Sequence, residues 1–255
     1  MIAALVIMPF AAGLTAFFLR RRWLRQTVLL GTALSHTLLT RWCWLARVLP
    51  RAGAWIGLDA AGMLFLSILS GLFLLAACYA IGYLRRERAA EHQDFEEGFV
   101  FANQPEAIFT GCLLLFLGTM SWVCISRHLG LLWVAVEATT LASAPLIYFH
   151  RHHRSLEATW KYLLICSVGI ALALLGTFFL GVAATGSDGH TLPLTIDNLL
   201  QQSGRLQPAW LRAAFIFLLV GYGTKMGLAP LHTWLLDAHS EAPSVVSALL
   251  SGAVL

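Results

Sequence analysis

The chain has 255 residues, of which 58% are hydrophobic and only 12% are charged, and its mean hydropathy is +0.74. A soluble domain carries roughly a quarter charged residues, so the composition excludes an ordinary soluble domain and predicts an integral membrane protein. The net charge of +4 does not indicate nucleic-acid binding, because the basic residues lie at the ends of apolar segments. The five cysteines lie singly in apolar stretches, so we expect no iron–sulfur cluster, no zinc and no other cofactor.

Hydropathy predicts an all-α transmembrane bundle with seven spans and the beginning of an eighth. The first seven segments are each near the ~20 residues that a helix needs to cross a bilayer. Their approximate limits are 2–19, 27–46, 61–83, 107–126, 130–149, 159–182 and 210–228, and the eighth runs from 244 onward. The polar stretches 84–106 and 184–209 are the main predicted loops. The chain divides into N-terminal helices with their loop (1–106) and a second helical region (107–255).

Arginine clusters predict the orientation of the bundle. They follow spans one, three and five, so all of them fall on one side, which should be cytoplasmic. These residues are Arg20, Arg21, Arg22, Arg25, Arg85, Arg86, Arg88, Arg151 and Arg154. We therefore expect a multi-pass protein of a bacterial inner membrane with its N-terminus on the outside.

The last apolar run begins near Val245 and reaches the final residue, Leu255. About a dozen residues are too few to cross a bilayer as a helix. We therefore expect either a fragment or a truncated product whose last helix is completed by a partner.

Lysine is rare in this chain and lies only in apolar sequence. Of the 17 Lys and Arg residues, only Lys161 and Lys225 are lysines. Arginine stays protonated under essentially all conditions, whereas a desolvated lysine can lose its proton near neutral pH. The placement of the two lysines fits a reversible proton carrier inside the membrane.

Glu137 lies in the middle of the fifth span, in LLWVAVEATTLASAPLIYF. An ionised carboxylate at that depth costs at least ~2.5 kcal/mol, so it should face the bundle, be partly neutral or pair with a cation. Thr139, Thr140 and Ser143 offer a polar seam beside it. The alternative is a structural glutamate that holds helices together.

Lys225 lies in GYGTKMGLAPLHTWLLDAH, between the glycines Gly223 and Gly227 and shortly before Pro230. Proline removes a backbone donor and clashes with the preceding turn, so this seventh helix should break. A broken helix at membrane depth is tolerated only inside protein or beside a wet cavity, and ion-coupled transporters use such helices at their sites. The alternative is a kinked structural helix with a snorkelling lysine.

Four further ionisable residues follow the predicted break. His232 is a candidate proton relay, because histidine exchanges protons near neutral pH, or else a core histidine. Asp237, His239 and Glu241 form a candidate cytoplasmic mouth of the path, or they only cap helix ends.

Lys161 has a strong alternative role, because Glu157 lies four residues before it and the two suit an ion pair at a helix start. The histidine-rich run HRHHR at 150–154 favours an interfacial anchor over a metal site.

Several of these segments together resemble the proton-pumping, antiporter-like membrane subunits of respiratory complex I, Mrp-type antiporters and membrane-bound hydrogenases. The resemblance rests on WVAVEATTLASAPLI, on WKYLLICSVGIALALLGT and on GYGTKMGLAPLHTWLLDAHSEAPSVVSALLSG. Among these subunits, the sequence is most similar to component F of hydrogenase-4. The resemblance covers about residues 107–255. Within that family, 107–255 corresponds to the first part of the proton-translocating helical domain, ending inside span eight.

The resemblance implies roles for four residues. Glu137 and Lys225 would form a coupled pair, Lys161 would modulate it, and His232 would pass protons along a central polar axis. Leu236 departs from the family, which usually has proline there, so the helix after the break should end differently. Members also have a second helical half that completes the path, so this chain would hold half of a proton path.

The favoured hypothesis is a proton-translocating subunit of a hydrogenase-4-like or complex I-like oxidoreductase, without a catalytic centre of its own. Its expected partners are other membrane subunits, a peripheral iron–sulfur arm, the lipid bilayer and protons, with Na⁺ as an alternative ion. The alternatives are a cation/proton antiporter subunit and a non-pumping scaffold for a redox arm.

Overall fold

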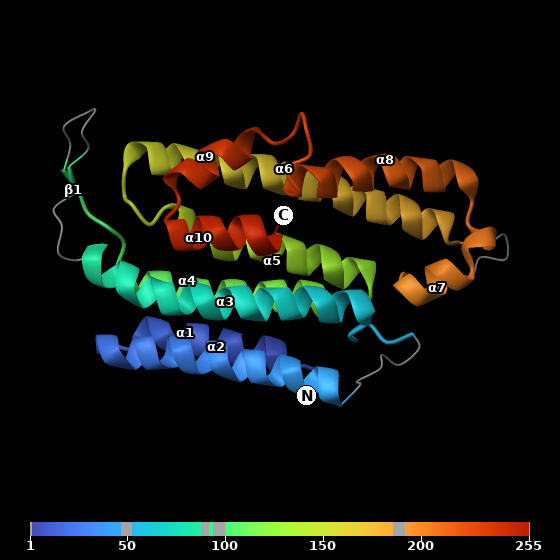
Figure 1. Cartoon of the computed structure of the whole chain (residues 1–255). Helices are drawn as coiled ribbons and strands as arrows, with labels where there is room; N and C mark the ends of the chain where they lie inside the picture. The colour runs from blue at the N-terminus through green and yellow to red at the C-terminus, as the bar shows by residue number, and fades with distance from the viewer. Residues whose placement is uncertain (1, 47–52, 88–91, 94–99, 186–191, 255) are drawn as a thin grey trace.

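The computed structural model describes residues 2–46, 53–87, 92–93, 100–185 and 192–254. Over these residues the chain is a bundle of long, roughly aligned helices with short connections (Figure 1). The helices are α1 (Ala4–Phe18), α2 (Arg22–Leu45), α3 (Ala60–Glu87), α4 (Glu106–Ile125), α5 (Leu129–Ile147), α6 (His153–Ala183), α7 (Ile196–Gln201), α8 (Pro208–Lys225), α9 (Thr233–Glu241) and α10 (Ser244–Leu249). The remaining elements are the 3-10 turn η1 (Ser203–Arg205), the π-helical turn η2 (Leu250–Val254), and the strands β1 (His92–Gln93) and β2 (Val100–Phe101), which pair antiparallel.

All eight apolar segments expected from hydropathy are helical, which confirms the all-helical fold. Within the described residues, four helices, α3 to α6, are long and apolar enough to cross a membrane, and α1 is a shorter apolar helix. The number of crossings therefore stays a prediction. The short helix α7 and the β1–β2 hairpin lie within stretches that we expected to be loops.

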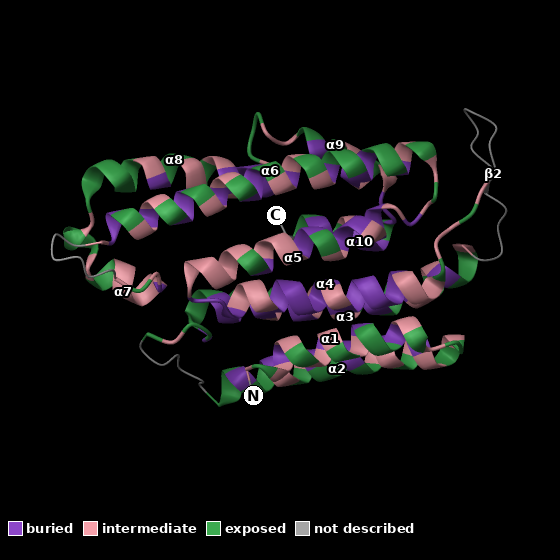
Figure 2. Cartoon of the chain, turned by 180° about the vertical axis from the view of Figure 1, so that it is seen from behind, coloured by how far each residue is buried: buried purple, intermediate pink, exposed green. Residues whose placement is uncertain are grey.

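α4 forms the centre of the bundle. Nearly three quarters of its most apolar window is buried, against 39% in α3, α5 and α6, and Figure 2 shows it as the most continuously buried helix. Small residues let its neighbours approach closely. A Cβ on Gly111 would lie 2.7 Å from the Phe17 ring, and one on Gly118 would lie 2.9 Å from the Phe10 ring, so glycines of α4 receive rings of α1.

α6 and α8 form a second close pair, which carries the region of Lys225. A Cβ on Gly221 of α8 would lie 2.5 Å from the backbone nitrogen of Ala173, and one on Gly169 of α6 would lie 2.7 Å from Thr224. The backbones therefore touch without intervening side chains. This approach places the end of α8 directly against the middle of α6.

α6 begins six residues earlier than the hydropathy limit of 159. Its 31 residues extend about 46 Å, longer than the ~30 Å hydrocarbon core, so its first turns extend beyond the apolar segment. His152 caps it by accepting a hydrogen bond from the Arg154 backbone N–H at 3.2 Å. His150 bonds to Tyr83 and Asn103, so this part of the HRHHR run joins α3 and the following loop to α6.

Ion pairs join the helices at both ends of the bundle. At the end where α2 and α4 begin, Glu106 lies 3.4 Å from Arg22 and 3.5 Å from the buried Arg25. At the opposite end, Arg127 lies 3.5 Å from Asp59 and is hydrogen-bonded to Asp197. Arg22 and Arg25, which belong to the predicted cluster after span one, therefore also hold helices together. Arg47, Arg51 and Arg88 lie outside the described residues.

Candidate functional site

Lys225 is buried where three helices meet. It is the last residue of α8, and its side chain is only 5% exposed. The Nζ donates hydrogen bonds to Thr140 Oγ1 of α5 at 2.9 Å and to the Tyr162 hydroxyl of α6 at 2.7 Å. The Tyr162 hydroxyl also shares a 2.7 Å hydrogen bond with Ser143 Oγ. Hydroxyl groups of α5 and α6 therefore surround the ammonium group.

Aromatic rings complete the surroundings of Lys225. Its Nζ lies 4.7 Å from the centroid of the Tyr162 ring and 6.0 Å from that of Trp234. The two rings pack against each other with centroids 5.1 Å apart. Ring faces attract a nearby cation, so the two rings add to the hydroxyl groups as neutral partners of Lys225 Nζ.

Glu137 lies one turn before Thr140 on α5, but it does not pair directly with Lys225. Its Oε1 accepts a 3.0 Å hydrogen bond from Ser167 of α6, and its buried Oε2 has no hydrogen-bond partner among the described residues. Glu137 is thus bonded to Ser167 of α6, whereas Lys225 is bonded to Thr140 and Tyr162.

The break after Lys225 follows from a helix-capping motif. Gly227 has a left-handed φ of 73°, its N–H bonds to the Thr224 carbonyl, and the N–H of Leu228 bonds to the Gly223 carbonyl. These two bonds form a Schellman cap. The cap ends the helix with a residue in the left-handed conformation, which glycine adopts without strain. α9 begins at Thr233, after Pro230, and it continues through Leu236 to Glu241.

Lys161 occupies a different environment from Lys225. Its side chain is 46% exposed, and its Nζ lies 2.8 Å from both Glu157 and Asp237. Lys161 thus forms the ion pair with Glu157 that the spacing of the two residues suits, and Asp237 is a second partner. α6 begins well before the apolar segment, so Lys161 lies towards the N-terminal end of the helix.

The residues after the break are spread along α9 rather than gathered in one cluster. His232 lies in the break, and its Nδ1 is buried with no hydrogen-bond partner among the described residues. Asp237 bonds to Lys161, whereas His239 bonds to Ser247 of α10. Glu241 is half-buried at the end of α9. The three residues of the expected mouth thus have separate surroundings.

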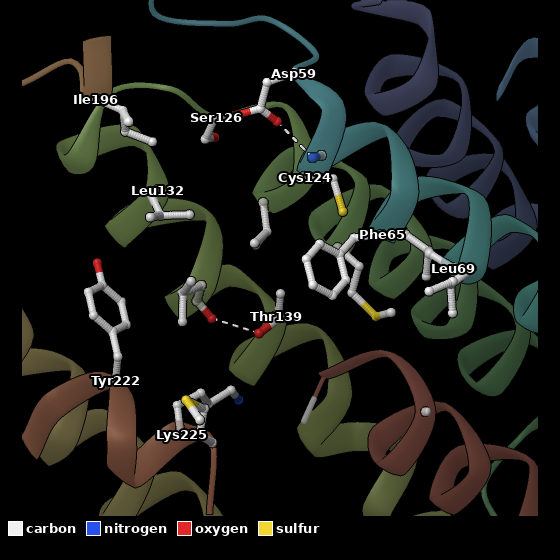
Figure 3. Close-up of a pocket in the computed structure, with 17 residues that line it drawn as sticks. Asp59, Phe65, Leu69, Cys124, Ser126, Leu132, Thr139, Ile196, Tyr222 and Lys225 are labelled. Atoms are coloured by element: carbon white, nitrogen blue, oxygen red, sulfur yellow. Dashed lines mark hydrogen bonds between the residues drawn. The ribbon is translucent and has the colours of Figure 1, made fainter. Parts of the chain in front are cut away.

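Lys225 also borders a cavity of about 570 Å³, which extends from Lys225 towards the starts of α3 and α5 (Figure 3). Tyr222 lines the cavity one turn before Lys225, and its hydroxyl is buried with no hydrogen-bond partner among the described residues. Thr139 lines it from α5, and Asp59 and Ser126 line its far end. Lys225 therefore lies between the aromatic pair and this cavity.

Sequence reasoning missed Tyr162, Ser167 and Trp234. Lys161 and Tyr162 are consecutive, so they point about 100° apart on the helix, and only one of them can face the bundle centre. The charge of Lys161 made it the candidate in the sequence, but Tyr162 is the one that faces the bundle centre and contacts Lys225.

His36 was also missed. It is fully buried in α2 and bonds to Ser70 of α3 at 2.9 Å and to Ser121 of α4 at 2.8 Å. A histidine in the middle of an apolar span was the signal that could have found it.

Comparison with known proteins identifies the family. Residues 126–255 match the family model described as "NADH:quinone oxidoreductase/Mrp antiporter, TM". The chain is 34% identical over 204 residues to the hydrogenase-4 component F homolog of Methylacidiphilum infernorum, which covers 80% of this chain and 41% of the relative.

Two solved structures share the fold over nearly the whole chain. A chain of an archaeal membrane-bound sulfane sulfur reductase superposes with a TM-score of 0.79 at 19% identity, over 98% of this chain and 50% of that one. A chain of respiratory complex I from Thermus thermophilus gives 0.76 at 21% identity, over 99% and 50%. The chain thus spans about half the length, or less, of these proteins. It belongs to the family of NADH:quinone oxidoreductase and Mrp antiporter membrane subunits.

Proposed function

We propose that this chain is a proton-translocating membrane subunit of a hydrogenase-4-like or complex I-like redox complex, and that Lys225 is its proton carrier. The observation that carries the proposal is that neutral groups enclose Lys225. They are the hydroxyls of Thr140 and Tyr162 and the rings of Tyr162 and Trp234, and we call them the Lys225 cage. The Nζ of Lys225 is buried and donates to two hydroxyl groups, and among the described residues no carboxylate lies within ion-pair distance of it. The likeness to hydrogenase-4 component F supports the choice of complex.

Such a cage suits both protonation states of lysine. A hydroxyl group accepts a hydrogen bond from an ammonium group and can rotate to donate one to a neutral amine. A carboxylate partner would instead hold the lysine in its charged form. Lys225 can therefore release a proton without leaving an unpaired buried anion behind.

Glu137 is the proposed partner that changes the charge balance at Lys225. Its unpartnered Oε2 and its position one turn from Thr140 support an alternating interaction between the two residues. When the carboxylate approaches, the ammonium form is favoured, and when it withdraws, proton release is favoured. His232, with its unpartnered ring nitrogen in the break, is the proposed next proton acceptor.

We extend the proposal to the remaining ionisable residues, to the membrane topology and to the partners of the chain. Lys161 and Asp237 form a modulating pair at the cytoplasmic surface, beside His239 and Glu241. The bundle crosses a bacterial inner membrane seven to eight times with its N-terminus outside. Other membrane subunits and a peripheral iron–sulfur arm complete the complex.

The test is Lys225→Ala in the reconstituted complex, with proton pumping measured together with electron transfer. We expect pumping to be lost while the complex still assembles. Unchanged pumping would contradict the role of Lys225 and favour a scaffold.

A cation/proton antiporter subunit is the second candidate, because the matched family model also describes Mrp antiporters. Proton movement that requires Na⁺ and no electron donor would favour it.

A further inference from the structure

Trp234 connects the two sides of the helix break. It belongs to the first turn of α9, after the break, and it is 1% exposed. Its indole Nε1–H donates a 2.9 Å hydrogen bond to the Thr224 carbonyl in the last turn of α8. Its ring also packs against Tyr162 of α6, which holds Lys225. One side chain thus contacts α8, α6 and the surroundings of the buried lysine.

The rest of α9 is weakly attached. Trp234 and Ala238 are its only buried residues, and Leu236 on the opposite face is 69% exposed. The Asp237–Lys161 ion pair joins α9 to α6, but both side chains are more than 40% exposed, so solvent screens it. Trp234 is therefore the main anchor of α9 on the α6–α8 pair.

The Trp234 hydrogen bond also reinforces the end of α8. The Thr224 carbonyl accepts from Gly227 N–H in the Schellman cap and from Trp234 Nε1–H, and Thr224 immediately precedes Lys225. If α9 moves away, the Thr224 carbonyl loses its bond to Trp234 and Tyr162 loses its ring contact in the same step. The Tyr162 side chain that holds Lys225 Nζ then keeps its hydrogen bond to Ser143 but loses the packing on its ring.

We infer that Trp234 is a positioning residue that closes the break side of the Lys225 cage and couples movement of α9 to proton access at Lys225. This inference rests on the proposed role of Lys225 as a proton carrier. With Trp234 in place, Lys225 is shielded from the break that contains His232. With Trp234 withdrawn, protons exchange between Lys225 and the break.

The first measurement is hydrogen exchange of the backbone amides of Gly227 and Leu228, followed by mass spectrometry on the intact purified complex. Trp234→Phe keeps a ring against Tyr162 but removes the indole N–H. We expect exchange at these amides to accelerate about threefold to tenfold, the factor for one lost hydrogen bond. Trp210→Phe is the matched control, because Trp210 of α8 stacks on Phe179 far from the break, and its exchange there should stay at the wild-type level.

The second measurement is passive proton leak through the reconstituted complex without electron transfer. We expect Trp234→Phe to increase the leak, and the double variant with Lys225→Met to restore the wild-type level. A leak that persists in the double variant would come from general structural damage and would overturn the inference. Wild-type exchange at Gly227 and Leu228 in Trp234→Phe would overturn it as well.

A variant that fails to fold is replaced by benzothienylalanine at position 234, which exchanges the indole N–H for sulfur and keeps the ring shape. Failure of the proposed function is distinguishable, because Lys225→Ala would then pump normally whatever the exchange rates of the Trp234 variants.

Discussion

At the residue scale, the two lysines show how position decides what a side chain can do. Lys161 is exposed between Glu157 and Asp237, which together hold its ammonium form. Lys225 is buried among hydroxyl groups and aromatic rings. Sequence singled out both, because lysine is rare in this chain. Only the packing of α6 against α8 separates the carrier candidate from the surface ion pair.

His36 provides a prediction at this scale, because its side chain joins three helices. His36→Ala would leave a cavity and remove one hydrogen-bond partner from each of the Ser70 and Ser121 hydroxyls, at a cost of about 1–3 kcal/mol. We expect a lower unfolding temperature in detergent. The exposed His153 supplies the control, since His153→Ala should leave that temperature unchanged. Equal temperatures for the two variants would mean that the His36 cluster adds nothing to stability.

At the element scale, the break after α8 was predictable in kind but not in detail. Gly227 and Pro230 indicated it, because neither residue favours a continuous helix. The Schellman cap that ends α8 at Lys225 is formed by neighbouring residues, whereas the return of the Trp234 indole to Thr224 depends on the path that the chain takes through the break. The start of α6 was placed too late for a different reason. Polar residues can extend a helix beyond the membrane, and hydropathy does not detect them.

Gly227→Ala tests the cap. The left-handed φ of 73° is strained for any residue with a Cβ and costs about 1–2 kcal/mol. We expect faster amide exchange around the break and a lower unfolding temperature. Gly71→Ala in α3 is the matched control, because a Cβ there meets no atom within 4 Å. If Gly227→Ala proved as stable as Gly71→Ala, the cap would be unimportant.

At the scale of the whole molecule, the sequence was sufficient for the helical bundle and the family, because long apolar runs leave helices as the main way to cross a bilayer. It was insufficient for the arrangement of the site. Glu137 and Lys225 were expected to pair, yet the structure places hydroxyl groups of Thr140, Ser143 and Tyr162 around the lysine, and Glu137 bonds to Ser167. Which faces of α5, α6 and α8 meet is set by small residues such as Gly169 and Gly221, whose role appears only in the packed bundle.

The central claim is that Lys225 must release a proton, and not merely carry a charge. Arginine keeps the charge but cannot release its proton, so Lys225→Arg separates the two requirements. Lys161→Arg is the matched control, because arginine can keep the surface ion pairs with Glu157 and Asp237.

The decisive measurement is the number of protons translocated per electron pair in the reconstituted complex. We predict loss of pumping in Lys225→Arg and near-normal pumping in Lys161→Arg. Full pumping in Lys225→Arg would contradict the account.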